Sequence, residues 1–322
     1  MNARTLTTAT LFTAFAGVIA ANAADSQLLS MVMPDAKVVA GVNVDSAKAS
    51  PFGRYVLAQL QTNNTDLQQL IAFTGFDPTR DVDEVLVATP SGVGGKANGL
   101  VLARGTFDPT LAALAATKGA LTEIYNGVTI IESPDQQAGI AFISTARVAA
   151  GDIASVKAAI DRQGSAPSLP SDVLTQVSKW SGAEDAWVVT TVPLAGLAPA
   201  GTTTTGTSGG GPMANPMAGV MQQVQQMAGG VKFGASVVGT AAIQADNAAD
   251  ATQLGNTLQF FVNLMQMQSQ KNPQMANLAQ AFSINATGTT VNVTITLPEA
   301  QFQQLFQMEK KAAVAAPMGG RK

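Results

Sequence analysis

The feature that most constrains the fold is an internal echo of one segment. Residues 35–39 read Asp-Ala-Lys-Val-Val and residues 185–189 read Asp-Ala-Trp-Val-Val, an offset of 185 − 35 = 150. Each copy opens an extended stretch rich in β-branched residues, which favours a β-strand. A polar residue and a proline follow each stretch, at Ser50-Pro51 and Asn215-Pro216, a pattern typical of a helix start. The echo therefore predicts two units of similar structure.

The order of the expected elements is also similar in the two halves. The second proline start lies at an offset of 165, so the later copy carries fifteen extra residues, which match a Gly/Thr-rich insertion at 200–214. In the first half we expect strands at 84–89, 99–104, 128–131, 139–143 and 147–150, with helices at 108–118 and from 153. In the second half we expect a helix at 213–228, strands at 232–238, 240–245, 282–287 and 290–297, and helices from 247 and 298.

These elements define the expected fold class and its boundaries. Residues 291–297 alternate between apolar and Asn/Thr side chains, the pattern of a sheet covered on one face. We therefore predict an α+β protein with two similar halves, each an antiparallel sheet with helices packed on one face, loosely ferredoxin-like. The expected parts are a signal peptide at 1–23, a first half at 24–165, a second half at 166–309 and a flexible tail at 310–322. The pattern leaves open whether the halves share one sheet.

The N-terminus has the pattern of an export signal. Arg4 is followed by an uncharged run from Leu6 to Ala21, which ends in Ala21-Asn22-Ala23. Signal peptidase accepts only small side chains at the first and third of these positions, so we expect cleavage before Ala24. An uncleaved N-terminal anchor is the alternative, but the run is shorter than the roughly 20 residues that span a bilayer. The expected location is therefore periplasmic or secreted, with no membrane anchor after cleavage.

Two missing residue types exclude many kinds of chemistry. The 322 residues contain no cysteine and no histidine. Their absence removes Cys-His and Ser-His-Asp nucleophiles, ordinary zinc sites, histidine-ligated haem, iron–sulfur clusters and a lipoprotein anchor. The formal net charge of −3 gives no basic field for nucleic acid. We therefore expect no cofactor, no metal and no nucleic-acid partner.

The densest acidic cluster is formed by Asp77, Asp81 and Asp83, with Glu84 directly after them. Carboxylate-rich loops can bind Ca²⁺, but this segment lacks the EF-hand spacing and contains Arg80. The same Phe-Asp-Pro-Thr sequence recurs at Asp108, which favours a reused helix start. Whether the three acids bind an ion is open at this stage.

A methionine series marks a candidate partner-binding surface. Met213, Met217 and Met221 recur every four residues, so a helix would place them on one face. Three interpretations compete: core packing, a groove for an apolar partner and, without His or Cys support, a Cu(I) site. Trp187 joins this candidate surface because Lys37 occupies its position in the first copy, which suggests an outward-facing or edge position suited to sugar stacking.

An enzymatic alternative rests on carboxylates. Glu123, Glu132 and Asp135 can supply a pair of acids on adjacent strands, as glycoside hydrolysis requires. Ser-Lys chemistry also needs no histidine, but Ser155 and Lys157 fall early in an expected helix rather than at a strand–helix elbow. A pocket that gathers these acids with a buried cation would favour a hydrolase.

Some turns and strands resemble a known group. The signal peptide, the Pro-Asp-Ala-x-Val-Val strand at 34–39, Ser-Pro-Phe-Gly at 50–53 and the Gly-Phe-Asp approach at 75–77 resemble a loose group of uncharacterised exported bacterial proteins. The resemblance implies an exported chain with duplicated α+β halves and supplies no catalytic residues. We therefore predict a non-enzymatic exported protein that acts by binding or assembly in the cell envelope or medium. Its partner would be a protein or a small apolar or polymeric ligand; the alternatives are a hydrolase and a hydrophobic-ligand or chaperone-like binder using helix 213–228.

Overall fold

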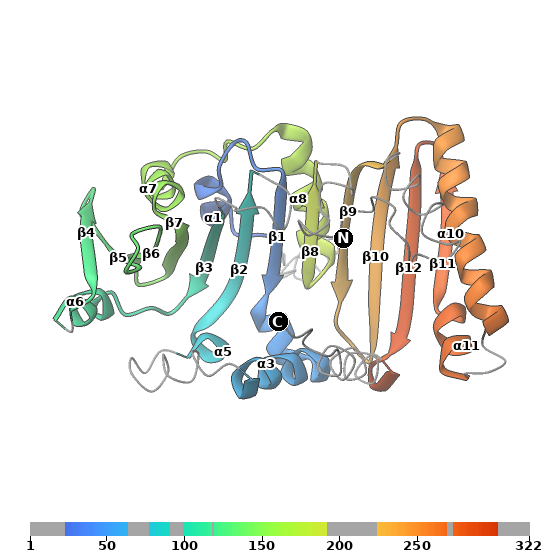
Figure 1. Ribbon diagram of the computed structural model, residues 1–322, viewed down its shortest axis with the longest axis horizontal. Coiled ribbons are helices and arrows are strands. Elements are labelled where there is room, and N and C mark those ends of the chain that lie inside the picture. Colours follow the sequence, from blue (N-terminus) through green and yellow to red (C-terminus); the bar gives the residue numbers. More distant parts are fainter. Residues whose placement is uncertain are drawn as a thin grey trace, which may run out of the picture.

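The computed structural model describes residues 23–63, 77–90, 99–117, 119–191, 224–268 and 273–301. Their strands form one 12-stranded sheet in the order β11-β12-β10-β9-β8-β1-β2-β3-β7-β6-β5-β4, with antiparallel pairing throughout (Figure 1). The strands are β1 (Val38–Asn43), β2 (Val82–Thr89), β3 (Leu100–Gly105), β4 (Leu121–Tyr125), β5 (Val128–Glu132), β6 (Ala138–Ser144), β7 (Arg147–Asp152), β8 (Ala186–Thr190), β9 (Val224–Lys232), β10 (Ser236–Ala245), β11 (Phe282–Thr287) and β12 (Thr290–Pro298). The expected α+β class with antiparallel pairing is confirmed.

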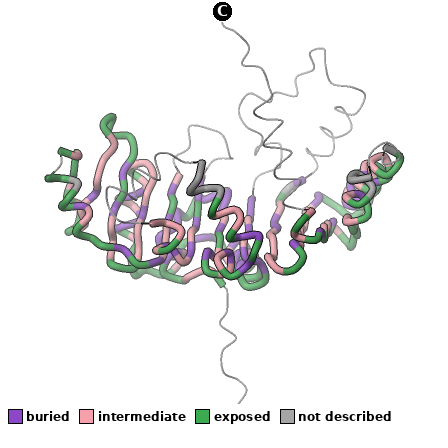
Figure 2. The backbone as a smooth tube through the Cα atoms, turned by 90° about the horizontal axis from the view of Figure 1, so that it is seen from below, coloured by how far each residue is buried: buried purple, intermediate pink, exposed green. Residues whose placement is uncertain are grey.

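The described helices lie on both faces of the sheet, whereas the sequence predicts helices on only one face of each half. They are α1 (Ser26–Met31), α2 (Val44–Ala49), α3 (Pro51–Asn63), α5 (Pro78–Asp81), α6 (Thr110–Thr117), α7 (Ile153–Arg162), α8 (Ser171–Ala183), α10 (Ala248–Gln268) and α11 (Pro273–Gln280). The sheet is curved, and α3 and α10 lie on its concave side, which faces the reader in Figure 1 and which we call the front (Figure 2). Helices α1, α7 and α8 cover the opposite face, the back. Strand β2 suits cover on both faces of the sheet, because its residues from Val85 to Ala88 are apolar on both sides.

The main core lies on the back of the sheet, between its central strands and the helices. Leu28 and Met31 of α1, Leu86 of β2 and Val177 of α8 are fully buried there. A second, smaller core lies on the front, where Ala251 and Leu254 of α10 pack on Val291 of β12. The two cores bury opposite faces of one continuous sheet.

Local sequence signals explain where several helices begin. The Ser50 hydroxyl accepts a hydrogen bond from the Gly53 N–H at 2.8 Å and so caps α3. Asp77 and Asp108 each accept the N–H of the residue two positions later, at 2.9 Å. The repeated Phe-Asp-Pro-Thr sequence is thus a helix start in both places, as predicted. The predicted hairpin of residues 282–287 and 290–297 is also confirmed, as β11 and β12.

The second half differs from the prediction around β9. Val224 and Met227 belong to β9, so the C-terminal end of the predicted helix 213–228 is a strand instead. Strand β10 is continuous through Gly239, where the sequence predicts two strands. Residues 224–228 gain their strand conformation from pairing with β8 and β10, which outweighs the weak local helical pattern, and β10 continues through Gly239 because it pairs with β9 and β12 on both sides.

Candidate functional site

Two unbroken rows of apolar residues cross the front of the sheet. Side chains directly opposite each other in paired strands share a face, so the pairing register identifies each row. The first row crosses eight strands and consists of Gly229, Val188, Ala40, Val87, Val101, Ala150, Ile140 and Ile131. The second consists of Val231, Ala186, Val42, Val85, Ala103, Val148 and Phe142.

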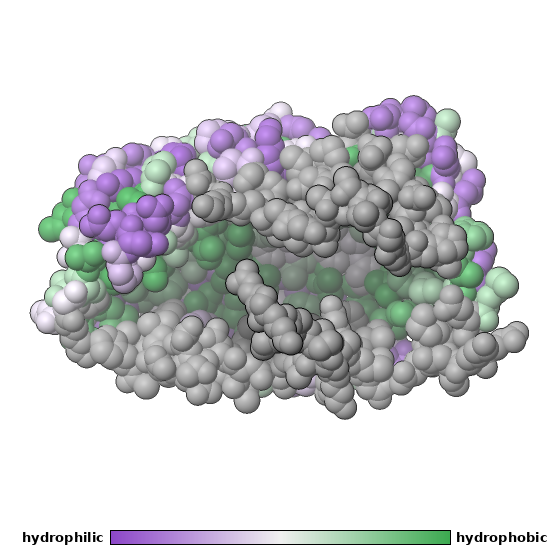
Figure 3. All heavy atoms as spheres, in the orientation of Figure 1, coloured by the Kyte–Doolittle hydropathy of each residue, from purple (hydrophilic) through white to green (hydrophobic). Residues whose placement is uncertain are grey.

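Much of this apolar front surface is open to solvent in the first half. Val42 is 37% exposed, and Val87 and Val101 are each 40% exposed. Figure 3 shows a hollow lined by hydrophobic residues across the front of the molecule. Monomeric proteins rarely expose contiguous apolar surface without a binding role, so the front of β1, β2 and β3 is the first candidate for function.

A pocket opens on this surface where α3 crosses it. Its volume is about 520 Å³, and residues of β1, α2, α3, α5, β2, β8 and the β9–β10 turn line it. Among the described residues that line it, none is ionisable and Thr79 carries the one polar side chain. The lining residues are Val42, Val44, Ala47, Phe52, Gly53, Val56, Leu57, Pro78, Thr79, Val82, Val85, Ala186 and Phe233.

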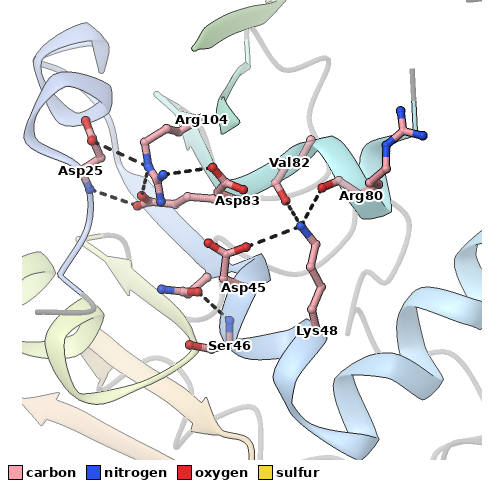
Figure 4. Close-up of polar contacts among 10 residues, drawn as sticks. Asp25, Asp45, Ser46, Lys48, Arg80, Val82, Asp83 and Arg104 are labelled. Carbon is pink, nitrogen blue, oxygen red and sulfur yellow. Dashed lines mark hydrogen bonds and ion pairs between the residues drawn. The ribbon is translucent and has the colours of Figure 1, made fainter. Parts of the chain in front are cut away.

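Helix α3 is held over the sheet by a close approach to α2. A Cβ atom added at Gly53 would lie 2.1 Å from the Ala47 carbonyl oxygen, so only glycine allows this contact. The rings of Phe52 and Phe233 lie 5.6 Å apart between centroids and close one side of the pocket. The Lys48 ammonium donates to the carbonyls of Arg80 and Val82, at 3.0 and 2.7 Å, and so ties α2 to the start of β2 (Figure 4). The wall of the pocket is therefore held in place by contacts with the backbone oxygens of Ala47, Arg80 and Val82.

A polar cluster lies on the back of the same strands. The Arg104 guanidinium lies 3.2 Å from Asp83, 3.4 Å from Glu84 and 3.8 Å from Asp25 (Figure 4). Glu84 is 7% exposed, and its second oxygen accepts the N–H of Asp25 at 3.1 Å. Burial raises the pKa of the Glu84 carboxyl, an effect that the Asp25 N–H and Arg104 partly offset.

Trp187 does not face outward, and the prediction of an exposed position is wrong. Its side chain is 6% exposed and belongs to the main core on the back. The ring lies over Gly41 of β1, where an added Cβ would meet it at 2.6 Å. Lys37, its counterpart in the echo, is exposed just before β1. Gly41, opposite Trp187, makes room for the ring. A comparison of the two copies of the echo does not reveal this pairing.

The methionine surface cannot be placed in the same way. Met213, Met217 and Met221 lie outside the described residues, as does the Gly/Thr-rich insertion at 200–214. The cleavage motif at Ala21 lies outside them too, whereas Ala23 is described and exposed.

The acids of the predicted clusters are engaged with other groups. Asp77 caps α5, and Asp81 forms an ion pair with Arg80 that lowers the pKa of the Asp81 carboxyl. Asp83 faces Arg104 instead. Within the described ranges, no group of three potential ligands is arranged to hold a metal ion.

The carboxylates of the enzymatic alternative lie near the outer edge of the sheet. Glu123 and Lys157 form an ion pair of 2.7 Å, which lowers the pKa of Glu123. Glu132 lies next to Glu123, and Asp135 accepts from Ser133 within its own turn. A general acid at neutral pH needs a raised pKa, so the shift at Glu123 is opposite to that requirement.

Comparisons with known proteins support the fold. No family model matches the chain, and no curated protein matches its sequence. The solved structure of TP0453 (crystal form I) is similar, with a TM-score of 0.51 and 10% sequence identity, covering 88% of this chain and 97% of that one. At this identity the likeness extends to the fold alone. Among the described helices, none is both long and apolar enough to cross a membrane.

Proposed function

We propose that this chain is an exported, non-enzymatic protein whose pocket beneath α3 binds the aliphatic chain of a lipid-like molecule. The pocket itself carries the proposal, because it is large, almost wholly apolar and continuous with an exposed apolar surface. Its volume of about 520 Å³ lies within the ordinary range for small-ligand sites. A lining without ionisable groups suits a ligand that needs no polar partner.

An aliphatic chain fits this pocket better than a peptide does. A peptide brings backbone N–H and C=O groups, each of which must find a hydrogen-bond partner when buried. The lining offers one polar side chain, Thr79. The ladder groups of β1 and β2 are already paired within the sheet, so they offer no free edge for strand addition.

The burial of the residues just after the predicted cleavage site supports an exported, processed chain. Ala23 is exposed, whereas Leu28 and Met31, a few residues later, are completely buried in the main core. Cleavage after Ala23 would leave every described core residue in the mature chain, as export by a cleaved leader requires.

We also propose that the two halves are copies of one unit. From the centre outward, the second half has the order β8-β9-β10-β12-β11 and the first has β1-β2-β3-β7-β6, so each third strand is followed in the sheet by the last strand of its half. Val39 pairs directly with Val189, and 39 + 150 = 189, which supports a pseudo-twofold axis between these two residues. The hairpin β4–β5 would be an addition to the first copy.

The proposed binding is tested by a matched pair of charged variants. Val42 and Val87 have similar exposure on the same face, but only Val42 lines the pocket. We expect Val42→Asp to weaken binding of a dansyl-labelled fatty acid at least about tenfold, because the ligand would have to bury the new charge. Val87→Asp should change the Kd by less than about threefold. Fluorescence titration of the purified variants measures both.

Three outcomes decide between the alternatives. Equal loss in both variants would move the site from the pocket to the open sheet surface. No saturable binding by the unsubstituted chain would overturn the proposal. Displacement of the probe by an apolar peptide but not by unlabelled fatty acids would replace the lipid-like ligand with a peptide.

A further inference from the structure

The residue that follows the predicted cleavage site lies in a polar environment. The backbone nitrogen of Ala24 donates to the Ser181 hydroxyl at 3.0 Å, and Ser181 is completely buried. The next nitrogen, that of Asp25, donates to the Glu84 carboxylate at 3.1 Å. The Ala24 nitrogen is thus one residue along the chain from the N–H that contacts this carboxylate. Ala24 itself is half-buried.

The same environment has an excess of negative charge. Three carboxylates, those of Asp25, Asp83 and Glu84, surround the single guanidinium of Arg104. Arg147 lies opposite Arg104 across β3 and β7, but within the described residues it forms no ion pair with the three acids. One more positive charge would bring the cluster closer to neutrality. A buried carboxylate gains most from a cation placed beside it.

We propose that cleavage between Ala23 and Ala24 creates an α-ammonium group at Ala24 that docks between the Ser181 hydroxyl and the Glu84 carboxylate. This inference rests on the export part of the proposed function and is independent of the ligand. A peptidase and water hydrolyse the Ala23–Ala24 peptide bond: the hydroxyl joins the Ala23 carbonyl carbon, and the nitrogen leaves as an amine that takes up a proton. The new group has three N–H donors where the amide has one.

Cleavage would thus free the chain from its leader and also add a stabilising contact to the folded protein. In the uncleaved chain, the Ala24 amide is neutral and cannot compensate Glu84. In the cleaved chain, the ammonium would bind α8 through Ser181, next to the contact that the Asp25 N–H makes with Glu84 of β2. Both contacts span long sequence separations, so the new terminus joins elements of both halves.

The test compares two chains that differ by one residue. One begins at Ala24 with a free amine, released from a fusion by a specific protease, and the other carries a single glycine before Ala24. The rate of acylation of the N-terminal amine is measured against pH by mass spectrometry. We expect the pKa of the Ala24 amine to lie at least about one unit above the ordinary 7.7–8.0, and therefore acylation at pH 7 to be about tenfold slower. The glycine-extended chain should show an ordinary profile.

Two substitutions make the result specific. Glu84→Gln should return the pH midpoint of the Ala24 amine toward the ordinary range, because the compensating charge is gone. If this variant does not fold, Ser181→Ala tests the other contact and should also lower the midpoint. An ordinary midpoint in the unsubstituted chain, or a raised midpoint that both variants retain, would overturn the inference.

The outcome is separable from that of the ligand proposal. The pocket lies on the front of the sheet and the polar cluster on its back, so fatty-acid binding should be equal in the two chains. A raised pKa of the Ala24 amine without fatty-acid binding would support the docked terminus and contradict the proposed ligand. Mass spectrometry of the protein from its native source should give Ala24 as the first residue; any other terminus would contradict the inference.

Discussion

The two halves of the sheet share an apolar front but cover it differently. In the second half, the 21-residue helix α10 lies on β10, β11 and β12, and Val291 beneath it is fully buried. In the first half, the described helix that follows the third strand is α6, with eight residues, and it packs toward β4 and β5. Val87 and Val101 at the centre remain 40% exposed. Among the described helices, none covers the front of β2 and β3 as α10 covers the front of β10, β11 and β12.

The backs of the two halves also differ in the helices that cover them and in the side chains that they carry. Helices α1 and α7 cover the back of the first half, and α8 covers the back of β8 and β9 next to the centre of the sheet. In the second half, the back of β10 and β12 carries Thr240, Asn292 and Thr294, polar side chains that can face water. Exposed side chains thus lie on the back of β12 in the second half and on the front of β2 and β3 in the first half. In the second half the exposed face is polar, whereas in the first half it is apolar, and an apolar face is the one suited to an apolar ligand.

The largest expected effect separates the two faces of one strand. Leu86→Ala removes a fully buried side chain on the back and should lower the free energy of unfolding by about 2–5 kcal/mol. Val87→Ala, one residue later on the open front, should lower it by less than about 1 kcal/mol. Urea denaturation measures both. Similar losses would show that the front of the first half is covered in solution.

A double variant tests whether the open front is the source of exposed apolar surface. Val87→Thr combined with Val101→Thr keeps the side-chain shape and adds two hydroxyls, so binding of an apolar dye should fall roughly twofold. Stability should change by less than about 1 kcal/mol. Thr296→Ser, on the back of β12, is the matched control and should leave dye fluorescence unchanged. An unchanged signal in the double variant would place the dye elsewhere.

The smallest expected effect is a difference in pH dependence between front and back. In a chain that still carries a residue before Ala24, burial raises the pKa of Glu84. A raised carboxyl pKa gives stability that is full below the unfolded value near 4.3 and is lost as the pH rises through the folded value. Glu84→Gln should therefore gain stability relative to the unsubstituted chain as the pH rises from 4 to 7.

The expected gain is a melting-temperature shift of no more than about 2–4 °C, which thermal unfolding at several pH values would resolve. Fatty-acid binding provides the contrast, because no described residue that lines the pocket is ionisable. The protein's contribution to binding should therefore be constant over the same range, which a fatty alcohol probe with no titrating headgroup measures. If the stability of Glu84→Gln relative to the unsubstituted chain fell between pH 4 and pH 7, the raised pKa of the Glu84 carboxyl would be contradicted.

The sequence predicted the local features of this fold better than its assembly. Helix starts at Ser50, Asp77 and Asp108 follow from capping side chains and the residues beside them, and the hairpin of β11 and β12 follows from alternation. The single continuous sheet depends on the pairing of β1 with β8, which lie about 150 residues apart in sequence, and no local pattern specifies that contact.

The candidate site was hidden from sequence for the same reason. Its lining is drawn from segments between Val42 and Phe233, and each residue alone reads as ordinary core. One signal was available: β2 has an apolar run without alternation, which predicts burial on both faces, although the structure leaves Val87 open on one of them. The position of Trp187 depended on Gly41 in the neighbouring strand, which the echo could not reveal.

Photo-crosslinking with a fatty acid that carries a diazirine at the end of its chain tests the central claim most directly. After irradiation, digestion and peptide mapping, the adducts should fall within residues 42–57 and 78–85, the walls of the pocket. An excess of unlabelled fatty acid should suppress them, and Val42→Asp should remove them. Adducts concentrated on α10, or spread over the surface and insensitive to competitor, would contradict a binding site on the open apolar front of the first half.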